Sequence, residues 1–396
     1  MMLQKIKNLL NTKLNVIKYF FLRHPIIYNV NKANENVYKK RALFVYQTTP
    51  FLLKEDDSLL LQHHSLKQAL QIAKVIGSFS YIVDVADYRD EKYRTNNNYD
   101  LIISHNVNSR INKLNLNKDC KIIYLSSGMY HILHNKLIKA RYDSLFERRK
   151  VKILPKRLAS EKISFLDNVE CIIGFGNEYI LNTWGKIYNK PIFTFNNYGY
   201  KGTKYNIDKK NFDLAKKNYL FFSGGDMVWK GLDLLLEIFP KHPELHLYIC
   251  ADYINEKDFK CLYRKELFDT PNIHPIGYIR PNSNEYEQVV NKCAYIIHPS
   301  ATDGQPGGVI QCMNSGLIPI ISKECGINIG DEGIILNNCS IEEIEATLLQ
   351  SSNRATDWLI EKSKTNRDLS NDQYSEDAFI KRWESILNSI MMNNRS

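Results

Sequence analysis

Two loops of the sequence combine glycines with a charged side chain directly before a helical pattern. In "YIIHPSATDGQPGGVIQ" (295–311), Asp303 and Gly304 follow an apolar run, and Gly307 and Gly308 stand where the helical pattern starts. Glycines at a helix start let backbone N–H groups approach an anion, and the helix dipole adds partial positive charge. The carboxylate of Asp303 can accept hydrogen bonds from hydroxyl groups. The ordinary alternative is a tight strand-to-helix turn in which glycine provides backbone freedom.

The second loop lies in "FFSGGDMVWKGLDLLLEIF" (221–239) and carries a lysine just before an apolar-periodic helix. Gly224 and Gly225 end the preceding strand, and Lys230 follows five residues later. A lysine in this place can hold a phosphate as a point charge, and such a charge-assisted hydrogen bond contributes ~1.5–3 kcal/mol. A lone lysine at a helix start is usually solvated, so the weight of this loop comes from its pairing with the first.

Histidines provide further candidates for chemistry. His105 ends the run "DLIISHN" (100–106), where an imidazole could act as an acid/base or orient a substrate, or could be purely structural. His131 and His134 follow Ser127 and Gly128 at a spacing of three residues. This spacing suits two metal ligands, but no third ligand accompanies them, so no metal site is predicted. We interpret them as helix residues near a substrate entrance.

Short apolar runs alternating with helical stretches must position these residues. Continuous apolar strands between helices are typical of a parallel sheet covered on both faces, whose ligands bind beyond the carboxyl ends of the strands. We therefore predict two Rossmann-like series. The expected strands are 42–46, 80–87, 100–106, 121–127, 169–175 and 190–195 in the first series, and 218–225, 244–252, 272–279, 293–300 and 317–322 in the second.

The change of pattern along the chain predicts its domain organisation. Residues 1–40 form a basic amphipathic segment, and 41–200 form the first α/β domain. A polar stretch at 201–217 without apolar periodicity is the expected linker, and 218–374 form the second domain. A final helix within 375–396 carries an apolar face.

Composition and charge limit the class of protein. The 396 residues are 44% hydrophobic and 24% charged, which excludes a long disordered chain and a small disulfide scaffold. The formal net charge of +10 favours anionic partners or reflects a solvated surface. None of the eight cysteines forms a C-x-x-C pair, and buried thiols in a reducing cytoplasm are the simplest interpretation. No signal peptide or membrane-spanning run is apparent.

Two basic stretches raise the question of a membrane surface. Leu3, Ile6 and Leu10 begin an amphipathic helical pattern with lysines on its other side, which fits either the headgroup layer of an anionic membrane or packing on the protein body. Residues 139–162 are rich in arginine and lysine, which suits acidic headgroups, a phosphorylated acceptor or a solvated face.

The two glycine-containing loops together resemble the C-terminal half of retaining glycosyltransferases of family 4, which have the GT-B fold. "GGDMVWKGLDLLLEIF" is similar to that family's loop with a phosphate-binding lysine, and "HPSATDGQPGGVIQCMNSGLIPIIS" to its nucleotide-sugar segment. The resemblance covers about 218–325 well and 41–200 more weakly. It implies an α/β protein with two Rossmann-like domains facing across a cleft, and a C-terminal helix, with Trp383, packing back on the N-terminal domain.

The resemblance also implies a role for each matching residue. Lys230 would bind the donor diphosphate, helped by Gly224, Gly225, Gly304 and the helix start at Gly307, Gly308 and Val309. Asp303 would hold the donor sugar as a catalytic-site residue, and Gln311 would contact the nucleotide ribose. On the acceptor side, Ser127 and Gly128 are the nearest match to a His-Gly pair that the family often has near the transferred sugar. His131 and His105, the second catalytic candidate, come from their positions in the sequence and not from the resemblance.

The sequence departs from the family pattern at several positions. Asp303 and Gln311 replace the two glutamates of the Glu-x7-Glu motif, and Gly225 replaces an arginine common in the family. The Gly-rich loop after the first strand is replaced by "QTTPFL" (47–52). Asp and Gln still accept hydrogen bonds, so activity is compatible with these changes.

Three hypotheses follow. The first is a metal-independent glycosyltransferase that needs no cofactor and moves a sugar, with retention, from a nucleotide-sugar donor to a glycan or lipid-linked acceptor of a cell-surface polysaccharide, lipopolysaccharide or capsule. It would be cytoplasmic, or peripheral on the inner face of the membrane. The second is a non-catalytic glycosyltransferase-like glycan-binding protein or partner subunit. The third, nucleic-acid binding, lacks a recognisable motif. The sequence does not identify the donor sugar, its nucleotide base or the oligomeric state.

Overall fold

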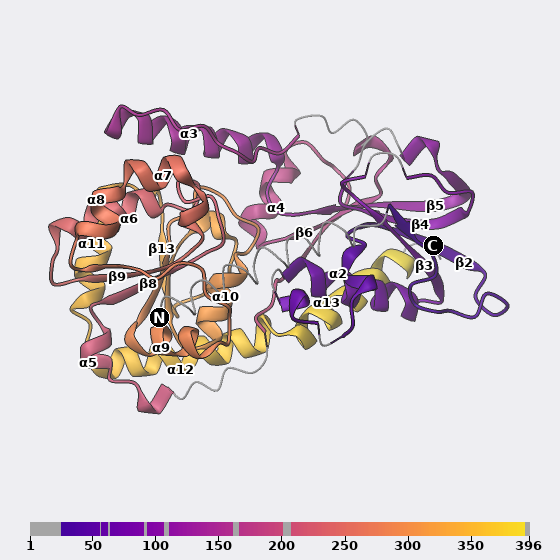
Figure 1. Ribbon diagram of the computed structural model, residues 1–396. Helices are drawn as coiled ribbons and strands as arrows, with labels where there is room; N and C mark the ends of the chain where they lie inside the picture. Colours follow the sequence, from indigo (N-terminus) through magenta and orange to yellow (C-terminus); the bar gives the residue numbers. More distant parts are fainter. Residues whose placement is uncertain are drawn as a thin grey trace.

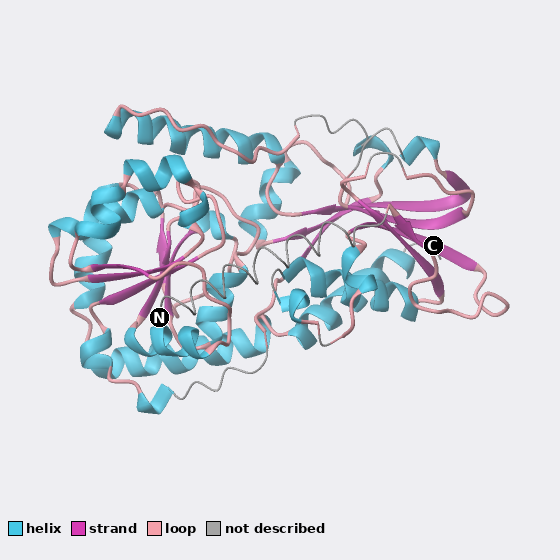
Figure 2. Ribbon diagram, in the orientation of Figure 1, coloured by secondary structure: helices cyan, strands magenta, loops and turns pink. Residues whose placement is uncertain are grey.

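The computed structural model describes residues 25–55, 57–61, 64–90, 93–106, 111–160, 166–200 and 207–392. Within these ranges two α/β domains lie side by side, each built on a twisted sheet with helices on its faces (Figures 1 and 2). This confirms the predicted fold class. The predicted amphipathic helix at the N-terminus falls in residues 1–24, outside the described residues.

The N-terminal sheet has the strand order β1-β3-β2-β4-β5-β6-β7, and every described pairing is parallel except that of β1 with β3. The strand order reverses between β2 and β4, and ligands of open parallel sheets bind at such a switch point. Its strands are β1 (Ile26–Ile27), β2 (Lys40–Tyr46), β3 (Tyr81–Asp87), β4 (Asn98–Ser104), β5 (Asn115–Ser126), β6 (Cys171–Phe175) and β7 (Ile192–Phe195). Its helices are α2 (His64–Ser78), α3 (His131–Arg149), α4 (Glu178–Gly185) and α13 (Glu376–Met392).

The C-terminal sheet is parallel throughout, with the order β10-β9-β8-β11-β12-β13. This is the Rossmann order, with its switch point between β8 and β11. Its strands are β8 (Asn218–Phe222), β9 (His246–Cys250), β10 (Ile273–Pro275), β11 (Tyr295–His298), β12 (Ile318–Ser322) and β13 (Ile334–Leu336). Its helices are α5 (Phe212–Ala215), α6 (Leu232–Ile238), α7 (Lys257–Leu262), α8 (Arg264–Asp269), α9 (Asn284–Lys292), α10 (Gly307–Asn314), α11 (Ile341–Ser352) and α12 (Thr356–Gln373).

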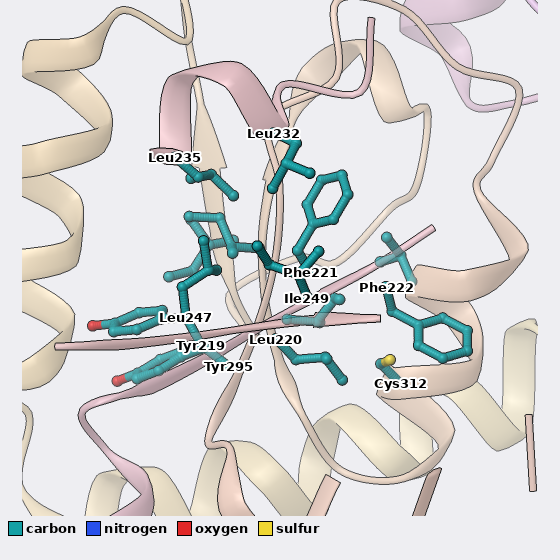
Figure 3. Close-up of a cluster of buried hydrophobic side chains, with 14 of the residues drawn as sticks. Tyr219, Leu220, Phe221, Phe222, Leu232, Leu235, Leu247, Ile249, Tyr295 and Cys312 are labelled. Carbon is teal, nitrogen blue, oxygen red and sulfur yellow. The ribbon is translucent and has the colours of Figure 1, made fainter. Parts of the chain in front are cut away.

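The core of the C-terminal domain forms around β8 and β11. Tyr219 and Tyr295 stack in register on the two strands, with ring centroids 5.1 Å apart (Figure 3). Both rings are fully buried, and each hydroxyl donates a hydrogen bond to a carbonyl of α11, that of Leu348 (2.8 Å) or Ser351 (2.7 Å). These bonds satisfy the buried polar ends of the rings and fix α11 against the sheet.

The C-terminal helix α13 packs on the N-terminal domain, as the resemblance implies. The chain runs along α12 beneath the C-terminal domain and continues in α13 beneath the other (Figure 1). Phe379, Trp383 and Ile386 are buried in the N-terminal core, and the Trp383 ring lies 5.0 Å from that of Phe195. The last helix therefore ties the two domains together.

Helix α3 takes a position that the sequence did not predict. It starts in the N-terminal domain and lies over the C-terminal one, above α6 and α8 (Figure 1). Ile138, Tyr142 and Leu145 belong to the C-terminal core, and Arg148 binds Asp233 at 2.5 Å. Part of the basic run 139–162 is therefore a contact between domains. For that part, the predictions of a solvated face and of a lipid-binding face are both wrong.

Two boundaries differ from the sequence prediction. Residues 207–217 of the expected linker contain α5, and Ile207, Phe212 and Ala215 are buried in the C-terminal core. Because short apolar contacts in a polar stretch give no periodic signal, sequence patterning misses them. Before residue 41, β1 pairs with β3, so residues 26 and 27 belong to the N-terminal sheet.

Candidate functional site

The two predicted loops meet beyond the carboxyl ends of β8 and β11. The ammonium of Lys230 forms an ion pair with Oδ2 of Asp303. Both side chains are largely buried, at 12% and 13% exposed. The meeting point is the switch point of the Rossmann order, because β8 and β11 are the neighbouring strands at which the order reverses. Two of the predicted site residues are thus brought into direct contact.

Asp303 has two further partners. Its Oδ1 accepts the amide of Gly304 at 2.9 Å, and Nε2 of His298 lies 3.3 Å from Oδ2. Burial alone would raise the pKa of the Asp303 carboxyl, but the Lys230 ammonium and the His298 hydrogen bond outweigh burial and hold this pKa well below its usual range. Asp303 is therefore a carboxylate at neutral pH.

His298 is a member of the site that sequence reasoning did not single out. It ends β11, is 1% exposed and lies nearly parallel to the Phe221 ring, with centroids 5.7 Å apart. Burial lowers the pKa of His298, so its ring is neutral at neutral pH. Its Nε2 carries the hydrogen and donates a hydrogen bond to the Asp303 carboxylate. Its place at a strand end, five residues before Asp303, is the signal that could have found it.

Trp229 is a second residue that the sequence analysis passed over. Its indole Nε1 donates to the carbonyl of Thr302, which joins the two loops. Lys230 Nζ lies 4.6 Å from the centroid of the indole ring, Arg157 Cζ 5.6 Å and the His134 ring 5.1 Å. Cations near an indole ring are stabilised by its quadrupole, so Trp229 organises the basic groups of the site.

The loop after β8 is fixed by side chains from other parts of the chain. Glu256 accepts the amides of Asp226 and Met227, and Arg157 forms an ion pair with Asp226. A Cβ added at Gly224 would meet nothing within 4 Å, and one at Gly225 would meet only Glu256. The predicted donor-binding glycines thus border open space.

The start of α10 is crowded by close backbone approaches. A Cβ at Gly308 would lie 2.8 Å from the carbonyl oxygen of Phe222, and one at Gly307 would overlap the ring of His64. The amide of Val309 donates to the carbonyl of Pro306 at 3.0 Å. Gly308 is therefore required for helix–strand packing, and the amide of Val309 is occupied within the turn.

Gln311 is engaged in contacts within the chain. It is fully buried, its Oε1 accepts the amide of Tyr200 at 2.8 Å, and its Nε2 donates to Asn282 at 2.8 Å. Gln305, six residues earlier, accepts the amide of Asn197 at 2.7 Å. The bonds to Tyr200 and Asn197 fasten the segment that crosses between the domains to α10 and its loop, while the bond to Asn282 holds Gln311 within the C-terminal domain.

The N-terminal domain meets this site through the predicted residues at the end of β5. A Cβ at Gly304 would overlap the carbonyl oxygen of Ser127, and Gly128 lies against Gly304. Nδ1 of His134 lies 3.1 Å from the hydroxyl of Thr302. Burial lowers the pKa of His134 to about 4, so this imidazole is neutral at neutral pH. Loops at the carboxyl ends of both sheets therefore face each other.

Two predicted histidines make their described contacts within the N-terminal domain. The His131 ring packs against Tyr130 at 4.7 Å and Trp184 at 6.2 Å, within the N-terminal domain. The His105 ring makes edge contacts with Tyr46 at 5.7 Å and Tyr88 at 5.1 Å, and Nδ1 is 2.9 Å from the Leu125 carbonyl. The contacts described for both rings stay inside their own domain and do not include Asp303.

No group of three or more His, Cys, Asp or Glu side chains that could hold a metal ion is found among the residues that the structure describes. No helix in the described ranges has the length and apolarity needed to cross a membrane.

Two facing Rossmann-like domains, joined by a returning C-terminal helix, give the chain the GT-B fold. Residues 217–353 match the family model described as glycosyl transferases group 1. No curated protein sequence matches the chain.

Solved structures share the fold at low sequence identity. A sucrose-phosphate synthase from Thermosynechococcus elongatus is 11% identical, with a TM-score of 0.58 and coverage of 89% of this chain and 99% of that one. HepE from Anabaena, in complex with UDP and glucose, is 12% identical, with a TM-score of 0.53 and coverage of 89% and 100%. A glycosyltransferase from Rickettsia africae is 11% identical, with a TM-score of 0.53 and coverage of 90% and 100%.

Proposed function

We propose that the protein transfers a sugar from a nucleotide-sugar donor to a glycan or lipid-linked acceptor, with retention of anomeric configuration, in the synthesis of a cell-surface polysaccharide. The observation that carries the proposal is the Lys230–Asp303 pair, in which Asp303 stands four residues before the start of α10. It supplies an ammonium for a diphosphate and a carboxylate for sugar hydroxyls, and the helix start that follows favours an anion.

The bound donor would exchange the partners of this pair. The donor's diphosphate would form an ion pair with the Lys230 ammonium in place of Asp303. The Asp303 carboxylate would then accept hydrogen bonds from hydroxyls of the sugar. The open space beside Gly224 gives the phosphates room, and His298 keeps Asp303 oriented. The lysine and the dipole of α10 would stabilise the leaving diphosphate, which is the largest charge that develops in the reaction.

The comparisons favour a uridine nucleotide as the first donor to test. HepE, which shares the fold, is described in complex with UDP-glucose and with UDP and glucose. Sequence identity of 12–13% supports only a choice of probe for this chain. The proposal that the anomeric configuration is retained rests on the family resemblance. Determining the anomeric configuration of the product tests it.

Peripheral binding to an anionic membrane is a second part of the proposal, together with a cytoplasmic location. The segment that follows α3 exposes Val151, Leu154 and Leu158 at 40–65% of their surfaces. Lys152 and Lys156 stand exposed between them. Alternating apolar and cationic side chains suit an anionic headgroup layer. Cosedimentation with phosphatidylglycerol vesicles, lost in a Leu154→Ser, Lys156→Ser variant, would support this part, and equal binding to neutral vesicles would contradict it.

The alternative is a non-catalytic protein of the same fold, which the structure of Gln311 favours. That side chain is fully buried and already bonds Tyr200 and Asn282, so a ribose would have to compete with these partners. A thermal-shift screen against UDP, GDP, CMP and their sugar conjugates separates the two. A ligand at 100 times its dissociation constant stabilises the folded state by ~2.7 kcal/mol. A shift that disappears in Lys230→Ala supports the transferase, and no shift with any nucleotide supports the scaffold.

A further inference from the structure

His64 brings the N-terminal domain into contact with the start of α10. It is the first residue of α2, and a Cβ built on Gly307 would lie 2.5 Å from its Nε2. No Cβ fits there, so Gly307 is a glycine because the imidazole occupies that place. The edge of the ring that carries Nε2 therefore lies against the first residue of α10, the helix start that we propose binds the diphosphate.

The position of His64 is fixed from the crossing segment. Its ring stacks on Tyr200 with centroids 4.3 Å apart and an interplanar angle of 9°, and it meets Tyr198 edge-on at 6.2 Å. Tyr200 is in turn held to α10 by the bond between its amide and Gln311 Oε1. The His64 imidazole belongs to the N-terminal domain, but Tyr200 fixes its position relative to α10 of the C-terminal domain.

We propose that His64 donates a hydrogen bond from Nε2 to the donor's diphosphate at the start of α10, so that the N-terminal domain supplies a donor contact as well as the acceptor side. This inference rests on the proposed function, because it takes the diphosphate to bind between Lys230 and Gly307. The inference assigns a ligand contact to His64, which lies outside the two glycine-containing loops. Donor binding would then depend on the closed arrangement of the two domains.

The electrostatic surroundings link this contact to a proton. A helix N-terminus and the Lys67 ammonium, which lies 5.8 Å from the Tyr200 ring, disfavour an imidazolium in the empty site. The hydroxyls of Tyr198 and Tyr200 are neutral because burial raises the pKa of each, and Glu376 faces Tyr198. A bound diphosphate adds negative charge beside Nε2 and favours the imidazolium. Donor binding should therefore take up a proton at His64.

The test is isothermal titration of UDP-glucose and GDP-mannose into the full chain at about pH 6 and about pH 8, on either side of the ordinary histidine pKa. These diphosphate diesters do not titrate in that range. Wild type should bind about tenfold more tightly than His64→Gln at the lower pH, equivalent to ~1.4 kcal/mol, and at most about threefold more tightly at the higher pH. His246→Gln is the matched control, since His246 starts β9 and pairs with His274 at 3.1 Å.

The outcomes separate this inference from the proposed function. Donor binding that is equal in wild type and His64→Gln at both pH values overturns the role of His64 and leaves the transferase standing. Absence of binding to the wild type overturns both. Because a variant can fail through misfolding, the His64 imidazole is also titrated by NMR in the wild type, where its pKa should rise when the nucleotide sugar binds. An unchanged pKa would contradict the contact.

Discussion

Lys230 and Asp303, 73 residues apart in the sequence, form an ion pair in a largely buried position between two loops. Each removes the cost of burying the other's charge. Because breaking a buried pair leaves one charge without compensation, both side chains matter to the folded state as well as to ligand binding.

Removal of the lysine should therefore destabilise the protein. Lys230→Ala is expected to lower the free energy of unfolding by about 1–3 kcal/mol, since the buried Asp303 carboxylate keeps only His298 and the Gly304 amide as partners. The double variant Lys230→Ala, Asp303→Asn should recover part of this loss. Urea denaturation followed by circular dichroism measures both, and a double variant no more stable than the single one would contradict the pairing.

The pH dependence of stability should carry a signature of His134. Its pKa is about 4 in the folded protein, because burial is the largest influence and Lys230 and His131 act in the same direction. The unfolded chain takes up a proton below about pH 6.5, whereas the folded one does not, so stability falls as pH falls from about 6.5 toward 4. Between pH 6.5 and 5 this one group lowers the unfolding free energy by up to ~2 kcal/mol.

His134→Gln removes that proton while keeping a group able to hydrogen-bond Thr302. The unfolding free energy of the variant should vary less between pH 7 and pH 5 than that of the wild type, with a difference of about 1–2 kcal/mol. Parallel curves for the two proteins would show that His134 titrates normally in the fold.

The contact between α3 and the C-terminal domain should be a strong one. Asp233 is fully buried, burial raises its pKa to about 6, and Arg148 binds it at 2.5 Å. Arg148→Ala should cost about 3–5 kcal/mol of unfolding free energy, and Asp233→Asn in the same chain should relieve part of it. Lys150→Ala, which removes an exposed pair with Glu147, is the control and should change stability by less than about 0.5 kcal/mol.

Closure of the two domains should depend on Gly304. A methyl group there overlaps the Ser127 carbonyl, so Gly304→Ala must move the two loops apart. We expect an increased radius of gyration by small-angle X-ray scattering and a loss of turnover of at least tenfold. Gly185→Ala, where a Cβ meets nothing within 4 Å, should leave the scattering unchanged. Identical scattering from Gly304→Ala and wild type would refute the loop contact.

Local patterns in the sequence predicted most of the strands but not the long-range contacts between elements. Strand β12 at Ile318–Ser322 falls within the predicted strand at 317–322, because a short apolar run is typical of a strand buried in a parallel sheet. The association of Lys230 with the 301–306 loop followed from the family motif. Nothing local placed α3 over the other domain, since its arginines look like a solvated run until Asp233 and Glu237 are brought beneath them.

The same reason explains which site residues were missed. His64, His298 and Trp229 act through contacts with residues distant in the sequence or through burial, neither of which periodicity reveals. His105 follows β4 at a strand end, as predicted, where its ring makes edge contacts with Tyr46 and Tyr88, and its catalytic role stays a prediction. Strand ends therefore predicted the edge at which the site lies, while the choice of side chains depended on packing.

The central claim is tested most directly by measuring release of nucleoside diphosphate from the nucleotide sugar that gives the largest thermal shift. Wild type should release it, and release should increase when a suitable glycan or lipid-linked acceptor is added. Lys230→Ala and Asp303→Asn should each reduce turnover at least 100-fold, about 2.7 kcal/mol in the activation free energy. Turnover that survives in both variants, or a wild type that binds the nucleotide sugar and never releases the diphosphate, would contradict the account.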